Sequence, residues 1–271
     1  MADSRPIGVF DSGLGGLTVV KELKKHLPFE NIVYFGDTGR VPYGTKSKET
    51  IEKYAIQDEH FLLQKDVKLI VAACGTVSSV AAHTGDNLPV PFVGVVEHSV
   101  KAAVKVTKNK KIGIIGTAAT ISSGAHEKAI KKLMPEAQVF ANNCNLFVPI
   151  VEEGWYDQND AVAVETAARY LEPLKSAGVD TLIMGCTHYP VLEPIIAKIM
   201  GDTVTLINMG EATAVYVAEL LKEKDLLNES KNPSYNFFVS DKHKSFRTQA
   251  ERLLDSEIKE TQVEQVDINS L

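Results

Sequence analysis

Two of the three cysteines, Cys74 and Cys186, stand in matching sequence surroundings. Each ends a short apolar run of strand length, and each has a threonine within the next two residues. At the carboxyl end of a parallel strand, the helix that follows supplies free N–H groups and a dipole that stabilise a thiolate. Two such thiols on opposite sides of one carbon could take a proton from one face and return a proton to the other. The pair therefore predicts proton transfer that inverts a carbon centre.

The cysteines belong to a longer internal repeat. Residues 7–12 resemble residues 112–117 at an offset of 105, whereas Cys74 and Cys186 lie 112 residues apart. The seven additional residues predict an insertion, which we place at residues 154–160. The second strands of the two halves are expected at the offset of 105, and the fourth strands at the offset of 112. Order, spacing and chemistry agree, so the repeat predicts two similar units that face one another.

Short apolar, β-branched runs alternate with longer amphipathic segments along the chain. Apolar strands separated by helices predict parallel sheets that are covered on both faces. The predicted strands are 7–10, 32–35, 69–73, 92–95, 112–115, 138–141, 182–185, 204–207 and 236–239. The predicted helices include 17–26, 48–64, 160–175 and 243–254.

The expected fold is α/β, with two pseudosymmetric, doubly wound parallel-sheet lobes and the active site in the cleft between them. Residues 1–97 and 209–271 are expected to form one lobe, and residues 98–208 the other. Two chain crossings make a hinge, so cleft opening is expected to control substrate entry. The candidate functional residues divide between the lobes, with Asp11 and Cys74 in the first and Glu152, Cys186 and His188 in the second.

The composition excludes several classes of protein. The chain has 271 residues, of which 44% are hydrophobic and 24% charged, and its formal net charge is −6. This acidity argues against nucleic-acid and anionic-membrane partners. The sequence predicts no signal peptide and no run of the roughly 18 apolar residues that spans a bilayer. With three cysteines there is no closed disulfide framework, and we expect a reducing, cytoplasmic setting.

Five segments resemble the signature segments of the glutamate racemases in the cofactor-independent aspartate/glutamate racemase family. They are FDSGLGGL (10–17), PYG (42–44), CGT (74–76), FVPIVEEG (147–154) and GCTHYP (185–190). The resemblance implies interconversion of L- and D-glutamate without a cofactor or a metal. It also implies that D-glutamate serves peptidoglycan synthesis, and hence cell-wall biogenesis and cell shape. Relatives commonly pair, so a homodimer is expected.

The resemblance assigns roles residue by residue. It implies that Cys74 and Cys186 carry the proton transfers and that Asp11, His188 and Glu152 assist them, with Asp37 as a further candidate. Hydroxyls and backbone N–H groups near strand ends suit carboxylate groups of a substrate. The expected substrate-binding residues are Asp11, Ser12, Pro42, Tyr43, Gly44, Gly75, Thr76, Thr117, Thr187 and His188.

Position 75 departs from the family pattern, because the family usually has asparagine there and this chain has Gly75. An amide that would contact substrate is missing, whereas the backbone N–H is retained. The substrate could therefore be aspartate or another small carboxylate, and a related two-cysteine isomerase or decarboxylase stays open. A non-catalytic binding homologue is the alternative from another class.

The two thiols also have other interpretations. Cys74 and Cys186 could be buried structural thiols, could form a regulatory disulfide, or could bind zinc together with His188. Cys144 lies in no comparable motif and is expected to pack in a core.

Overall fold

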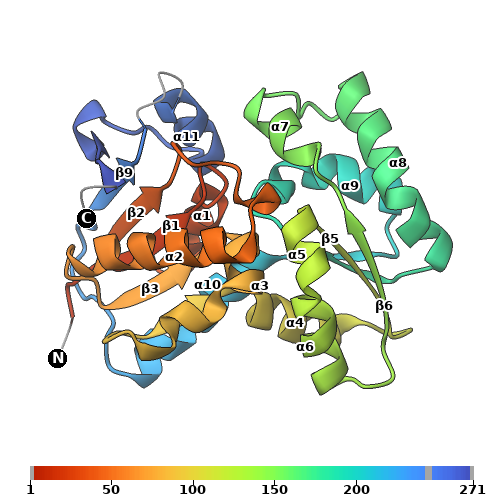
Figure 1. Cartoon of the computed structure of the whole chain (residues 1–271), viewed down its shortest axis with the longest axis horizontal. Helices are drawn as coiled ribbons and strands as arrows, with labels where there is room; N and C mark the ends of the chain where they lie inside the picture. Colours follow the sequence, from red (N-terminus) through yellow and green to blue (C-terminus); the bar gives the residue numbers. More distant parts are fainter. Residues whose placement is uncertain (1–2, 242–245, 269–271) are drawn as a thin grey trace.

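The computed structural model describes residues 3–241 and 246–268, which form two parallel sheets lying side by side (Figure 1). The first sheet has the order β10-β9-β2-β1-β3-β4 and the second β6-β5-β7-β8. We call the parts built on these sheets the first and the second lobe. The first sheet contains β1 (Ile7–Asp11), β2 (Ile32–Gly36), β3 (Leu69–Ala72), β4 (Phe92–Gly94), β9 (Tyr235–Val239) and β10 (Val263–Gln265). The second contains β5 (Lys111–Gly116), β6 (Gln138–Asn143), β7 (Thr181–Met184) and β8 (Thr205–Asn208).

Helices cover both faces of each sheet, as expected for a doubly wound fold. Successive residues of a strand point to opposite faces, so Val9 enters one core of the first lobe and Phe10 enters the other. One face carries α1 (Leu17–His26), α10 (Met209–Glu223) and α11 (Phe246–Leu254), and the other carries α2 (Lys48–Leu63) and α3 (Gly75–Val80). In the second lobe, α7 (Phe147–Glu152), α8 (Ala161–Ala177) and α9 (Glu193–Met200) lie opposite α4 (Val95–Val106) and α6 (Ala125–Leu133).

Shorter elements complete the chain. They are α5 (Ala118–Ser123) and the 3₁₀ turns η1 (Tyr43–Thr45), η2 (Ala82–Asn87), η3 (Tyr189–Leu192) and η4 (Glu260–Gln262). Across the part of the chain that the structure describes, no helix combines the length and apolar character needed to cross a bilayer.

The strand order confirms the internal repeat, because β2-β1-β3-β4 and β6-β5-β7-β8 follow the same path. Ile7 pairs with Leu69, and its counterpart Ile112 pairs with Thr181, which reproduces the predicted offsets of 105 and 112. The two-lobed α/β fold that the sequence predicts is therefore present.

The predicted offsets of the second and fourth strands were wrong by two residues. Ile7 pairs with Ile32, whereas Ile112 pairs with Val139, so β2 and β6 correspond at an offset of 107. The fourth strands likewise correspond at 114, because Phe92 and Leu206 occupy equivalent positions. The connections before β6 and β8 are two residues longer than their counterparts, and connection length leaves no trace in strand periodicity.

The predicted strands and helices match the observed elements with small shifts at their ends, and β10 was missed. Residues 243–245 of the last predicted helix lie outside the described residues, and α11 begins at Phe246. The chain passes from the first lobe to the second at α4 and returns at α10 (Figure 1). Helix α4 follows β4 but packs on the second sheet, and α10 follows β8 but packs on α1. The lobe boundaries at residues 97/98 and 208/209 remain a prediction.

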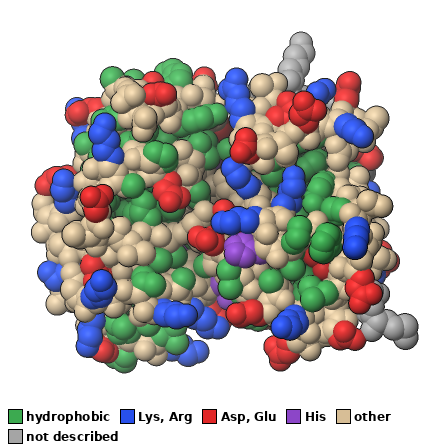
Figure 2. Space-filling view, turned by 180° about the vertical axis from the view of Figure 1, so that it is seen from behind, with side chains coloured by type: hydrophobic (Ala, Val, Ile, Leu, Met, Phe, Trp, Pro, Cys, Tyr) green, Lys and Arg blue, Asp and Glu red, His purple; other side chains and the backbone are tan. Residues whose placement is uncertain are grey.

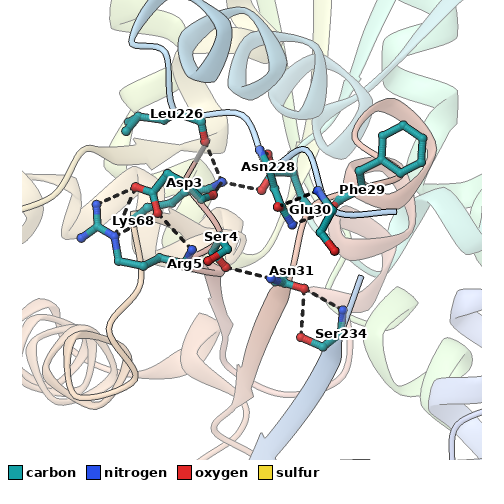
Figure 3. A network of polar contacts seen from close by, with 11 residues as sticks. Asp3, Ser4, Arg5, Phe29, Glu30, Asn31, Lys68, Leu226, Asn228 and Ser234 are labelled. Carbon is teal, nitrogen blue, oxygen red and sulfur yellow. Dashed lines mark hydrogen bonds and ion pairs between the residues drawn. The ribbon is translucent and has the colours of Figure 1, made fainter. Parts of the chain in front are cut away.

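A buried ion pair connects the segments that precede β1, β2 and β3 in the first sheet (Figure 3). The Lys68 Nζ lies 2.6 Å from Glu30 Oε2 and donates to the carbonyls of Asp3 and Leu226, each at 2.7 Å. The other Glu30 oxygen accepts from the backbone N–H of Asn228 at 2.8 Å. Because Lys68 directly precedes β3, this network anchors the strand that leads to Cys74.

Replacing this lysine tests how much the network contributes. We expect Lys68→Met to lower the free energy of unfolding by about 3–5 kcal/mol, because it leaves Glu30 charged and buried without a counterion. Lys53→Met on the exposed side of α2 is the matched control and should change stability little. Urea unfolding measures both, and an equal effect of the two variants would contradict a structural role for Lys68.

Candidate active site

Cys74 lies where β3 ends, at the N-cap of α3. Its side chain is buried, and its Sγ lies 3.7 Å from the Ser12 hydroxyl, which follows the neighbouring strand β1. Burial and the nearby charge of Asp11 raise the pKa of Cys74 to about 12. At neutral pH Cys74 is therefore a thiol, the form that can give a proton.

Cys186 lies at the equivalent place after β7 and has a different neighbour. Its Sγ is 3.8 Å from His188 Nδ1, and His188 Nε2 is 3.2 Å from the Glu152 carboxylate at the end of α7. Burial alone would lower the pKa of His188, but the hydrogen bonds to Cys186 and Glu152 outweigh burial and raise this pKa to about 10. His188 is therefore an imidazolium at neutral pH, and it places a positive charge beside the Cys186 sulfur.

Asp11 joins the two cysteine-bearing turns. It ends β1, is fully buried, and accepts from the backbone N–H of Gly13 at 3.0 Å and from the Thr187 hydroxyl of the second lobe at 3.3 Å. Burial raises the pKa of Asp11, and the charge of His188 opposes that rise. The Thr18 hydroxyl adds a second link by donating to the Thr187 carbonyl at 2.8 Å. These contacts bring groups of both lobes to one buried site.

Two further candidates meet across the cleft. The hydroxyls of Thr76 and Thr117 lie 3.0 Å apart, one at the start of α3 and the other at the N-cap of α5. Gly44 packs against Thr117 so closely that a Cβ on Gly44 would lie 2.7 Å from the Thr117 Cβ. The structure therefore places the PYG segment at the cleft through the backbone of Gly44, while Pro42 is exposed.

The hydroxyl of Tyr43, a predicted substrate-binding residue, is engaged elsewhere. It donates to Asp37 and lies 3.0 Å from Asp58 Oδ2, and Arg40 pairs with both carboxylates at 2.6 and 3.1 Å. Burial together with these carboxylates raises the pKa of Tyr43 well above its ordinary value. The network fixes the segment that ends in Gly44, so the structure gives Tyr43 and Asp37 a supporting place.

Gly75 lies at the contact between the two cysteine-bearing turns. A Cβ at this position would lie 2.5 Å from the carbonyl oxygen of Gly185 and 3.2 Å from Met209 Cε. A contact of 2.5 Å with a backbone atom requires the backbone to move, so the lobes meet here only because residue 75 has no side chain.

Comparison with known proteins agrees with this geometry. Residues 7–217 match the family model described as Asp/Glu/hydantoin racemase. The chain belongs to this racemase family. It is 46% identical over 256 residues to a glutamate racemase from Geobacter metallireducens, covering 94% of each chain, and 48% identical to one from Neisseria meningitidis serogroup A, covering 92% and 93%. A crystal structure of the Francisella tularensis glutamate racemase with D-glutamate superposes with a TM-score of 0.92 at 40% identity, covering 99% of this chain and 100% of that one.

Two of the alternative interpretations of the thiols in this racemase fold, the disulfide and the zinc site, are not supported. Cys74, Cys144 and Cys186 are all free thiols, so the disulfide is not formed. Within residues 3–241 and 246–268, the group of side chains with metal-ligand spacing is Glu22, His26 and Glu211, a set that contains neither Cys74 nor Cys186. Cys144 packs in the core of the second lobe, as expected.

Sequence reasoning missed two residues that hold the racemase cleft together. Thr18 lies on α1 and contacts Thr187, and Gln249 on α11 donates to the Glu152 carbonyl at 2.7 Å. Neither residue lies in a motif, and each contact exists only because the two lobes meet. No signal in a single sequence identifies them.

Removing the carboxylate of Glu152 tests its link to His188. In Glu152→Gln the pKa of His188 should fall, because one of the two contacts that raise it is lost. The alkaline limb of kcat/KM for racemisation should then move to lower pH by about one pH unit. Glu153→Gln, at the exposed neighbouring residue, is the control. Identical alkaline limbs in Glu152→Gln and wild type would show that Glu152 does not set the charge of His188.

Proposed function

We propose that this protein is a glutamate racemase that uses two cysteines as its bases. The observation that carries the proposal is the placement of Cys74 and Cys186 at equivalent strand ends of two lobes that meet at Asp11 and Thr187. The curated relatives are named glutamate racemases, and their identities of 46–48% extend over more than nine-tenths of the chain.

Inversion requires one sulfur that takes a proton and a second sulfur that gives one. The Cys186 thiolate, beside the His188 imidazolium, removes the α-proton of one enantiomer, and the electron pair is delocalised into the adjacent carboxylate. The Cys74 thiol then gives its proton to the opposite face of the carbon. The protonation states of the two sulfurs are now exchanged, and either reverse turnover or proton exchange with water restores them. No cofactor or metal takes part in this scheme.

The remaining groups of the site suit an amino dicarboxylate. Hydroxyls of Ser12, Thr76, Thr117 and Thr187, together with the backbone N–H of Gly75, offer donors to carboxylate groups. Asp11 offers an anion to the substrate ammonium group. Burial strengthens each of these interactions, because the charges are removed from water.

Aspartate or another small carboxylate is the alternative substrate within the same chemistry. Gly75 keeps this alternative open, because it offers no side-chain amide to the substrate. The names of the relatives favour glutamate. The other alternative is a homologue that binds its ligand without converting it. A measurement of turnover distinguishes this homologue from an enzyme.

In the cell we propose that the enzyme acts as a homodimer in the cytoplasm and supplies D-glutamate for peptidoglycan, and hence for cell-wall biogenesis and cell shape. A nucleic-acid partner does not fit the surface, because acidic and basic side chains are interspersed over the face shown in Figure 2 and the net charge is −6. Analytical ultracentrifugation would test the dimer.

Turnover in D₂O tests the activity and the substrate together. We expect each glutamate enantiomer to give the other with deuterium at the α-carbon, and aspartate to react about 10–200-fold more slowly, because one missing methylene in a fitted site costs about 1–3 kcal/mol. Proton NMR of the α-hydrogen measures the exchange. Absence of exchange with every amino acid would contradict the racemase assignment, and faster exchange with aspartate would reassign the substrate.

Cysteine variants complete the same experiment. Cys74→Ser and Cys186→Ser should each reduce racemisation by about 10²–10⁴-fold, the usual contribution of one acid or base. Cys144→Ser removes a buried thiol outside the site and should retain activity. If either of the first two variants racemised glutamate at the wild-type rate, the two-base scheme would be wrong.

A further inference from the structure

Helix α11 of the first lobe reaches across the cleft to the end of α7 in the second. The side-chain amide of Gln249 donates to the backbone carbonyl of Glu152 at 2.7 Å. Helix α11 is held in the first lobe by Phe246, Ala250 and Leu254, which are buried in its core. Glu152 is the last residue of α7, where helix carbonyls lack intrahelical partners. Gln249 therefore satisfies an exposed helix end of the other lobe.

The same helix covers the space beside His188. A cavity of about 20 Å³ lies between the lobes here, which is room for about one water molecule. The Arg252 Nη1 atom extends over the backbone of Gly154 and would lie 3.7 Å from a Cβ there. The cleft is thus closed on this side by α11. The cavity is lined by Leu14, Gln249, Arg252 and Leu253 of the first lobe and by Val151, Glu152, Gly154, Tyr156 and His188 of the second.

These contacts form a continuous path from the first lobe to a sulfur of the second. Gln249 holds the Glu152 backbone, the Glu152 carboxylate lies 3.2 Å from His188 Nε2, and His188 Nδ1 lies 3.8 Å from Cys186 Sγ. The Glu152 side chain is one-third exposed at the end of α7, whereas the buried residues Phe147, Ile150 and Val151 hold the rest of this helix in the core of the second lobe. Opening of the cleft would break the contact with Gln249 and release the end of α7.

We propose that Gln249 is a positioning residue that couples closure of the cleft to the pairing of Glu152 with His188. In the closed state the carboxylate is held on His188, and Cys186 is beside an imidazolium. In the open state the restraint on Glu152 is gone and the pairing weakens. The inference rests on the proposed function insofar as the pairing serves catalysis by Cys186.

A double-mutant cycle tests the coupling. Gln249→Met retains the length and helix propensity of the side chain but removes the donor. It should lower kcat/KM for glutamate about five- to tenfold, the usual effect of one hydrogen bond, and move the alkaline limb to lower pH. In Glu152→Gln the same change should move the limb no further, because the carboxylate that Gln249 positions is absent. Equal shifts of the limb in both backgrounds would overturn the proposal.

Alkylation of Cys186 by iodoacetamide tests closure without turnover. Gln249→Met should raise the alkylation rate severalfold, because the cleft opens more often, and Thr248→Ala on the exposed side of α11 should not. An unchanged rate in Gln249→Met would overturn the proposal even if wild type racemises glutamate. A raised rate would support closure by Gln249 even if wild type proved inactive toward glutamate, in which case only the proposed function fails.

Discussion

The site depends on one constraint: two thiols are buried, out of contact with water, where the two lobes meet. Burial favours a neutral sulfur, and at Cys74 the nearby charge of Asp11 adds to this effect, so the pKa of this thiol is raised to about 12. At Cys186 the second lobe supplies a buried imidazolium whose pKa of about 10 is maintained by Glu152 and by the sulfur itself. Two chemically identical side chains at equivalent positions of a repeat therefore have different surroundings, a carboxyl group near Cys74 and an imidazolium beside Cys186.

Glycines, which have no side chain, allow the two lobes to approach one another closely. Gly15 approaches Thr187, Gly44 approaches Thr117, and Gly75 approaches the Gly185 carbonyl, each closer than a side chain would permit. The hydrogen bonds between Thr76 and Thr117 and between Asp11 and Thr187 then span the closed cleft. Gly75 thus permits the close approach of the two cysteine-bearing turns.

The features of the fold and the site that depend on a local sequence pattern could be predicted from the sequence. Strands of alternating or continuous apolar residues and the repeated cysteine-threonine pairs identify the two sheets and place Cys74 and Cys186 at equivalent strand ends. Connection length is invisible to such a pattern, which is why the second and fourth strands were assigned offsets two residues short. The engagement of the Tyr43 hydroxyl with Asp58, and the contact of Gln249 with Glu152, depend on how separate elements pack. A motif gives the residue type at a position, and packing decides where its polar atoms go.

A crystal structure of this protein with D-glutamate would test the central claim most directly. We expect the α-carbon to lie between the two sulfurs, with Cys74 Sγ and Cys186 Sγ on opposite faces, each at about 3–3.5 Å. We also expect the Glu152–His188 contact to persist in that complex. Glutamate bound with both sulfurs on one face of the α-carbon, or with either sulfur out of reach of it, would contradict the account.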